Sequence, residues 1–257
     1  MRSYLFSLLV FAIPLGFISN GYAQDDLTKI KSDGVFKVGT EGTFPPFTYH
    51  DASGKLVGFD VDIAREIAKR IGVKAEFVEG RWDGLVAGLD ANRYDAVINQ
   101  VSITPERKAK YDFSEPYIAP KIVLIVNKNN TGIHAFSDLK GKKTALTLTS
   151  SFALDARKLG SDVVGTDGFD QSIALVIQGR ADATINSNLS FLDFKKHEPD
   201  APVKVVAEKT NAEQEAVLIR KNNPELRKEI NSAIEDIKND GTYQRISIKY
   251  FGVDVSK

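Results

Sequence analysis

From about residue 35 onward, short apolar runs alternate with segments whose apolar residues recur at helical spacing. Short apolar runs bounded by turn residues predict buried strands, and the helical spacing predicts amphipathic helices. The predicted order in the first part of the chain is strand, helix, strand, helix, strand, over 35–38, 60–71, 74–78, 82–89 and 95–98. Strands that alternate with helices in this way form parallel sheets covered by helices.

The helix expected over 60–71 has the clearest pattern. Its apolar stripe consists of Ile63, Ile67 and Ile71, with alanines beside them. Asp60 is expected to cap its start and Gly72 to end it, because these residue types are typical of the two positions.

The alternation restarts after residue 120, which predicts a second α/β unit. Strands are expected over 143–148, 162–164 and 181–185, and helices over 151–159 and 170–178. A last strand over 215–220 and a helix over 224–240, with Leu226, Ile230, Ile234 and Ile237 inward, complete the pattern.

One internal echo links the two units. Residues 93–99 (RYDAVIN) match 180–186 (RADATIN), each after an apolar helix. Chance can produce a match of this length, but two similar α/β lobes explain it simply. Ligands of open parallel sheets bind beyond the carboxyl ends of strands, so 99–102 and 186–188 are expected to face each other across a cleft.

The first 23 residues have the pattern of a secretory signal peptide. Arg2 is their one charge, residues 4–18 are a 15-residue apolar run, and Gly21 and Ala23 precede an expected cleavage site. An uncleaved anchor helix is the alternative, but the run is shorter than the roughly 20 residues that a bilayer needs. No cysteine follows it to carry a lipid, so we expect a freely soluble exported protein, which a periplasm would retain.

Composition excludes several classes of function. The 257 residues contain 34 Lys and Arg, 34 Asp and Glu, and no cysteine. Balanced charge offers no basic field for nucleic acid, and the lack of thiols excludes disulfides, thiolate metal sites and a cysteine nucleophile. His50, His134 and His197 are too far apart for ligand spacing, and no catalytic motif is present. We therefore expect no metal and no cofactor.

Arg107 is a candidate anion-binding residue. It belongs to the first turn of a helix expected to start with Thr104 as cap and Pro105 at the first helical position, next to the end of a strand. A guanidinium there can bind a carboxylate through two parallel hydrogen bonds, but it can equally form a surface salt bridge.

Two polar turns offer further candidates. Residues 147–152, which include Thr149, Ser150 and Ser151, join a strand to a helix whose start attracts anions, although the same residues can simply cap the helix. Residues 39–43, which include Glu41, form a similar turn before Phe44. Phe44 and Trp82 can form a ligand platform or belong to the core.

The sequence resembles the polar amino acid solute-binding proteins of ABC transporters, the bacterial extracellular solute-binding proteins of family 3. The likeness covers the mature chain in order and is carried by VGTEGTFPPF (38–47), GFDVD (58–62), WDGL (82–85), SITPER (102–107) and YDFSEPY (111–117). Residues 99–101 (NQV) and 164–169 (VGTDGF) are similar to the cystine-binding-like subgroup.

This resemblance implies a type II clamshell of two lobes, each a mainly parallel sheet flanked by helices, that closes on an amino acid and delivers it to a membrane permease. Lobe 1 would comprise 25–118 and 213–257, and lobe 2 would comprise 119–212. The resemblance also implies roles in ligand binding: Arg107 and Ser151 on the α-carboxylate, Phe44 over the ligand, Glu41 and Trp82 around its side chain, and Asn99, Gln100 and Ser102 along the site.

One departure bears on the ligand. The family usually has an Asp after the second echo to pair with the ligand ammonium, and this chain has Ser187. Leaving a buried ammonium without its carboxylate costs on the order of 3 to 5 kcal/mol. Either Glu41 or another acid takes over, or the ligand is a carboxylate without an α-amine.

Two other functions compete with transport. Cyclohexadienyl and arogenate dehydratases resemble this family, but residues 187–190 (SNLS) offer no acid of the kind such enzymes carry there. A sensor domain would need a fused signalling segment. We expect a monomer that is not an enzyme.

Overall fold

The computed structural model describes residues 25–209 and 213–255. The predicted signal peptide lies outside the described residues. No helix within the described ranges is both long and apolar enough to cross a membrane. The same part of the chain contains no group of three or more acidic or histidine side chains placed to hold a metal ion.

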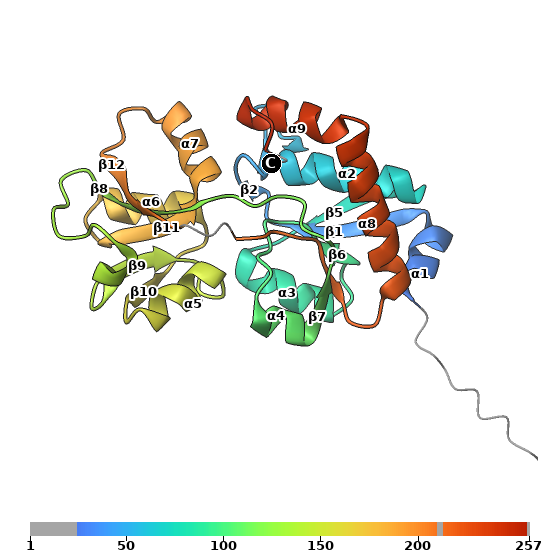
Figure 1. Cartoon of the computed structure of the whole chain (residues 1–257), viewed down its shortest axis with the longest axis horizontal. Helices are drawn as coiled ribbons and strands as arrows, with labels where there is room; N and C mark the ends of the chain where they lie inside the picture. The colour runs from blue at the N-terminus through green and yellow to red at the C-terminus, as the bar shows by residue number, and fades with distance from the viewer. Residues whose placement is uncertain (1–24, 210–212, 256–257) are drawn as a thin grey trace, which may run out of the picture.

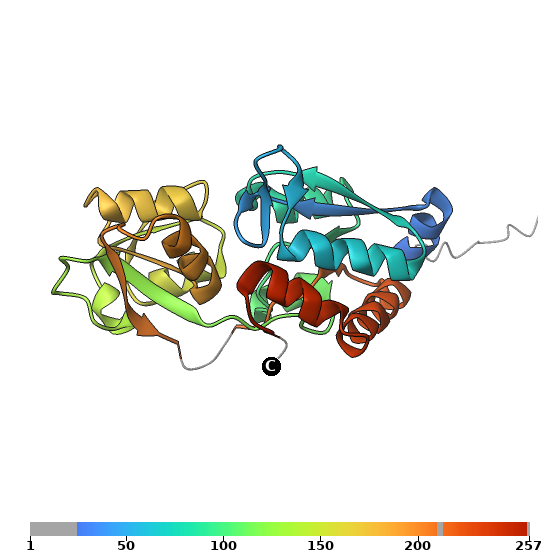
Figure 2. The same ribbon diagram turned by 90° about the horizontal axis from the view of Figure 1, so that it is seen from above.

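The chain forms two five-stranded sheets, each the centre of one lobe (Figures 1 and 2). Lobe 1 has the order β5 (Lys74–Glu79), β1 (Val35–Thr40), β6 (Ala96–Val97), β13 (Leu218–Arg220), β7 (Tyr111–Phe113). Lobe 2 has the order β10 (Asp162–Gly165), β9 (Lys143–Leu146), β11 (Ala183–Ser187), β8 (Ile122–Asn127), β12 (Val203–Glu208). In each sheet the fourth strand runs against the other four, so both sheets are mainly parallel.

Helices cover both faces of each sheet. Lobe 1 carries α1 (Asp26–Asp33), α2 (Phe59–Ile71), α3 (Trp82–Asp90), α4 (Pro105–Lys110), α8 (Pro224–Asn239) and α9 (Thr242–Phe251). Lobe 2 carries the short helix η1 (Phe136–Leu139), α5 (Ser151–Lys158), α6 (Phe169–Ile177) and α7 (Asn188–His197). A small sheet of β2 (Thr43–Phe44), β3 (Thr48–His50) and β4 (Leu56–Val57) lies beside α2. The expected α/β architecture is confirmed.

The apolar stripe of α2 explains how lobe 1 is packed. Ile63 and Ile67 are buried in a cluster that α2 shares with α1, α8 and α9, while α3 packs in a second cluster. Gly72 ends the helix in the left-handed conformation, as predicted, with φ of 88°. The prediction for Asp60 is wrong. The helix starts at Phe59 after Gly58, and the Asp60 side chain is fully buried rather than capping.

The echo marks equivalent strands. β6 and β11 occupy the middle of the two sheets. Asp95 donates its backbone N–H to the Lys37 carbonyl at 2.9 Å, and its carboxylate accepts from the Lys37 N–H at 2.8 Å. Asp182 makes the same pair of bonds with Lys143 at 2.8 and 2.7 Å. The repeated Asp therefore bonds the same way to a lysine backbone of the neighbouring parallel strand in both lobes, Lys37 of β1 and Lys143 of β9.

Two strand predictions need correction. The strand expected over 143–148 ends at Leu146, because residues 147–150 turn into α5. The strand expected from residue 215 begins at Leu218, because Glu215 instead forms isolated bridges with Ser102 and Ile118. Both strands, β9 and β13, are therefore shorter than predicted, and each loses residues at the end that approaches the space between the lobes.

Candidate functional site

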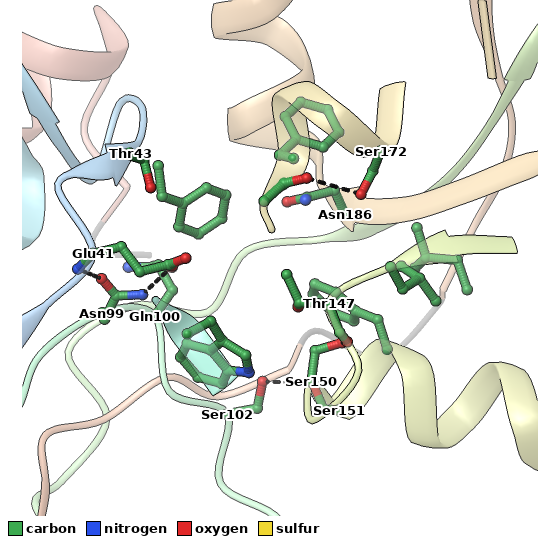
Figure 3. A pocket seen from close by; sticks show the side chains of 17 residues that line it. Glu41, Thr43, Asn99, Gln100, Ser102, Thr147, Ser150, Ser151, Ser172 and Asn186 are labelled. Carbon is green, nitrogen blue, oxygen red and sulfur yellow. Dashed lines mark hydrogen bonds between the residues drawn. The ribbon is translucent and has the colours of Figure 1, made fainter. Parts of the chain in front are cut away.

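A cavity lies between the lobes (Figure 3). Concave sites of this kind, lined by apolar side chains and a few polar groups, are where proteins bind small molecules. Residues at or just after the ends of β1, β6, β9 and β11 line it, as expected for ligand sites of open α/β sheets. Its lining is mixed: lobe 1 supplies Glu41, Thr43, Phe44, Trp82, Asn99, Gln100 and Ser102, and lobe 2 supplies Leu146, Thr147, Ser150, Ser151, Phe152, Gly168, Phe169, Ser172, Ile185 and Asn186.

The structure brings most of the sequence candidates together at this cavity. Those that line it are Glu41, Phe44, Trp82, Asn99, Gln100, Ser102, Ser150 and Ser151. Thr149, Arg107 and Ser187 are not among its lining residues. The hydroxyl of Ser187 accepts from the backbone N–H groups of Leu189 and Ser190 at 3.0 and 3.4 Å, so it caps α7.

Sequence reasoning missed the apolar wall in lobe 2, which includes Phe152, Phe169 and Ile185. Nothing in the local pattern separates these residues from core. The internal echo pointed to Asn186 as a cleft residue, because Asn186 is the counterpart of Asn99. Both asparagines line the cavity, from opposite lobes.

Arg107 lies just behind the cavity wall. Thr104 caps α4 and Pro105 takes its first turn, as predicted. The Arg107 Nη1 donates to the Ser102 carbonyl at 2.9 Å, and its guanidinium carbon lies 5.3 Å from the centroid of the Trp82 ring. Burial lowers the pKa of Arg107, which nevertheless stays a cation near neutral pH. A positive charge thus lies directly behind two lining residues.

Glu41 is held at the cavity by Asn99. The Asn99 Nδ2 donates to the Glu41 carboxylate at 2.6 Å, and the Asn99 Oδ1 accepts from the Glu41 backbone N–H at 2.8 Å (Figure 3). Burial raises the pKa of Glu41 to about 7, although the bond from Asn99 lowers it. A partner cation would therefore draw Glu41 fully into its ionised form.

Ser102 and Ser151 join the lobes beside an acid. Their hydroxyl oxygens are 3.1 Å apart, and both donate to Glu213, at 2.9 and 3.3 Å respectively. The Ser102 hydroxyl oxygen also lies 3.1 Å from Glu215 Oε1, so its single hydrogen is shared between the two acids. Burial raises the pKa of Glu215 well above its usual range. This side of the site therefore concentrates hydroxyl donors next to Arg107.

Ser150 caps α5, so the alternative role expected for the 147–152 turn, helix capping, is present in the structure. Its hydroxyl accepts from the Ala153 N–H at 3.1 Å and donates to the Thr147 carbonyl at 2.8 Å. Ser150 still lines the cavity, so capping and a place in the site are compatible. The start of an eight-residue helix thereby faces the cavity.

Thr149 bridges the lobes at the rim. Its backbone N–H and hydroxyl donate to the Asp83 carboxylate at 3.0 and 2.7 Å. Arg81 and Asp167 form a second pair across the rim at 3.1 Å, and Phe44 packs against the cores of both lobes. These contacts join opposite lobes, so the structure is a closed form.

Replacement of Asp83 by alanine is expected to weaken ligand binding by about 3- to 10-fold, because hydrogen bonds that exist only in the closed form favour the binding-competent state by about 0.5–1.5 kcal/mol. Isothermal titration calorimetry measures the change. Asp236→Ala is the control, since Asp236 is an exposed aspartate on α8 of lobe 1, outside the cavity. Equal affinities for the two variants would show that the rim bonds do not favour closure.

Comparisons with known proteins find relatives over the full length. The chain is 37% identical, over all of both chains, to a "Probable amino-acid ABC transporter-binding protein" of Haemophilus influenzae. It is 42% identical to the "L-cystine-binding protein TcyA" of Bacillus subtilis, over 93% of this chain and 89% of that protein.

Solved structures match both lobes. An ancestral arginine-binding protein bound to arginine has a TM-score of 0.81 at 42% identity, over 85% of this chain and 99% of that one. The unliganded, open L-cystine solute receptor of Neisseria gonorrhoeae has a TM-score of 0.60 at the same 42% identity, over 90% of this chain and 99% of that one. Equal identity with unequal superposition agrees with the closed lobe arrangement.

The family profile for "Bacterial extracellular solute-binding proteins, family 3" matches residues 36–253. That match spans both sheets, the interlobe cavity and the helices that frame it. The chain therefore belongs to the family 3 bacterial extracellular solute-binding proteins.

Proposed function

We propose that this protein binds an amino acid between its lobes and delivers it to an ABC permease. Two observations carry the proposal: a buried acid, Glu41, lines the interlobe cavity, and a cation, Arg107, lies behind its wall against the Trp82 ring. A zwitterion needs both signs of charge in a small desolvated space. Relatives named as amino acid transporter and cystine-binding proteins support this ligand class.

In this proposal Arg107 attracts the ligand carboxylate. The start of α5 offers backbone N–H groups to it, and Ser102, Ser150 and Ser151 would add hydrogen bonds by exchanging Glu213 and the Thr147 carbonyl for the ligand. Phe44 and Trp82 cover the apolar part of the ligand. Movement of Arg107 away from the Ser102 carbonyl would bring its free N–H groups to the carboxylate.

The ligand ammonium requires an acceptor other than Ser187. That hydroxyl already accepts two backbone N–H groups and has no charge. Glu41 is the acid that lines the cavity, and it is the first of the two explanations left open by the sequence. An amine-free carboxylate ligand is the alternative.

The protein acts as a carrier rather than an enzyme in this proposal. The lobe 2 segment 187–190 lacks the acid expected of a dehydratase, and close relatives are named as binding proteins. We further propose cleavage after Ala23, export to the periplasm, a monomer, and lobe boundaries at 118/119 and 212/213.

A ligand screen tests the proposal. The protein from Gln24 onward is unfolded, refolded to remove bound ligand, and heated with L-amino acids, L-cystine and matched carboxylates that lack the amine. Ligand at a thousand times its dissociation constant adds about 4 kcal/mol, which raises the melting temperature by several degrees. Stabilisation by an amino acid is expected. Stabilisation by amine-free carboxylates alone would replace the ligand class, and no stabilisation by either would overturn the proposal.

A further inference from the structure

Gln100 lies three residues after the end of β6 and has an unusual backbone conformation. Its φ is 50°, in the left-handed region that residues other than glycine seldom adopt. The side chain lines the interlobe cavity. A non-glycine residue held in this conformation at a ligand site points to a positioning requirement.

The Asp60 carboxylate fixes the position of Gln100 through two hydrogen bonds. One carboxylate oxygen of Asp60 accepts the Gln100 backbone N–H at 2.8 Å, and the other accepts the side-chain Nε2 at 2.8 Å. The Tyr117 hydroxyl donates to that second oxygen at 3.1 Å. Asp60 is completely buried, although it belongs to the first turn of α2. Three donors thus converge on one carboxylate.

These contacts decide which way the Gln100 amide faces. Burial raises the pKa of Asp60 to about 7, and its ionised carboxylate only accepts hydrogen bonds, so that form turns the amide NH₂ group toward Asp60 and the amide oxygen away. That oxygen, Oε1, is buried and has no hydrogen-bond partner within the residues that the structure describes. A buried acceptor without a donor is unfavourable, and a ligand N–H would satisfy it.

We propose that Gln100 is a specificity residue that accepts a hydrogen bond from the ligand ammonium through Oε1, with Asp60 as the residue that positions it. Gln100 and Glu41 both belong to lobe 1 and line the same cavity. The ammonium would therefore be recognised from lobe 1, whereas Ser187 in lobe 2 has no charge and caps α7. This inference rests on the proposed function, since it presupposes a ligand with an amine.

The test is a thermodynamic cycle that combines one substitution in the protein with one chemical change in the ligand. The variant is Gln100→Met, which keeps a similar length and removes the amide. The ligands are L-cystine and 3,3′-dithiodipropionate, which lacks only the two amines, with L-arginine and 5-guanidinopentanoate as a second pair. Calorimetry gives four dissociation constants for each pair. Gln244→Met on α9 is the control, because Gln244 is an exposed glutamine outside the cavity.

Gln100→Met is expected to weaken binding of the amino acid at least 10-fold and to change binding of the amine-free analogue less than 2-fold. Equal losses for both ligands would overturn the inference, because Gln100 would then only shape the cavity. Unchanged amino acid binding would overturn it as well. A wild-type protein that binds only the amine-free analogues, or none of the four compounds, would overturn the proposed function itself, which is a different result.

The positioning role of Asp60 has a separate readout. Asp60→Asn adds an NH₂ group that competes for the same contacts, so the Gln100 amide loses its fixed orientation. We expect the variant to lose selectivity for the amino acid over its amine-free analogue, provided that its circular dichroism spectrum is unchanged. If it is misfolded, the Gln100→Met cycle alone decides.

Discussion

Replacement of Arg107 by methionine is expected to lower amino acid affinity by about 10²- to 10³-fold, since removal of one partner from a desolvated ion pair costs about 3–5 kcal/mol. Calorimetry with the amino acid that stabilises the wild type measures the loss. Methionine retains much of the packing of Arg107 on Trp82, so the melting temperature should change far less than the affinity.

Two further variants sharpen this prediction. Lys108→Met removes an exposed charge from the same helix and should leave binding unchanged. Arg107→Lys retains the charge but cannot form two parallel bonds, so its affinity should be intermediate. If Arg107→Met binds the amino acid as tightly as Lys108→Met does, Arg107 has only a structural role, through its contacts with Ser102 and Trp82.

Replacement of Glu41 by glutamine is expected to abolish amino acid binding and its pH dependence together. Burial gives Glu41 a pKa of about 7, and the ammonium requires the ionised carboxylate. As the pH falls below 7, protonation competes with the ligand. Affinity of the wild type should therefore fall about 50-fold between pH 7 and pH 5, with a slope that approaches tenfold per pH unit well below the pKa. The same titration with Glu41→Gln should be weak and flat.

A pH dependence of affinity in the opposite direction would identify the alternative ligand, a carboxylate without an α-amine. An amine-free carboxylate would bind better to the protonated, neutral Glu41, so its affinity would rise as the pH falls. Glu76→Gln is the control for removal of an acid, because Glu76 is exposed on β5, outside the cavity. Unchanged amino acid affinity in Glu41→Gln would exclude Glu41 as the ammonium partner.

Much of the fold could be predicted from the sequence because its period is strong. The stripe of Ile63, Ile67 and Ile71 predicts α2 directly, and the echo at 93–99 and 180–186 predicts two equivalent sheets. The antiparallel direction of β8 and β13 was harder to predict, because it depends on partner strands that are distant in the sequence. β8 pairs with β11 and β12, which follow it by more than fifty residues.

The site shows where local pattern stops being sufficient. Asp60 has the local signature of a helix cap, and its burial depends on Gln100 and Tyr117, which are 40 and 57 residues away. Thr149 and Ser187 have hydroxyls of the right type at the right strand ends. Their bonds to Asp83 and to the start of α7 appear only when the lobes and helices are assembled.

Small-angle X-ray scattering of the refolded protein, with and without the amino acid that stabilises it, tests whether ligand binding closes the two lobes. In the proposed function the ligand lies between the lobes, and contacts such as Thr149 to Asp83 favour closure. We therefore expect the radius of gyration to fall on ligand addition, to the value calculated from the closed form described above. A ligand that binds tightly and leaves the scattering curve of an open protein unchanged would contradict this expectation.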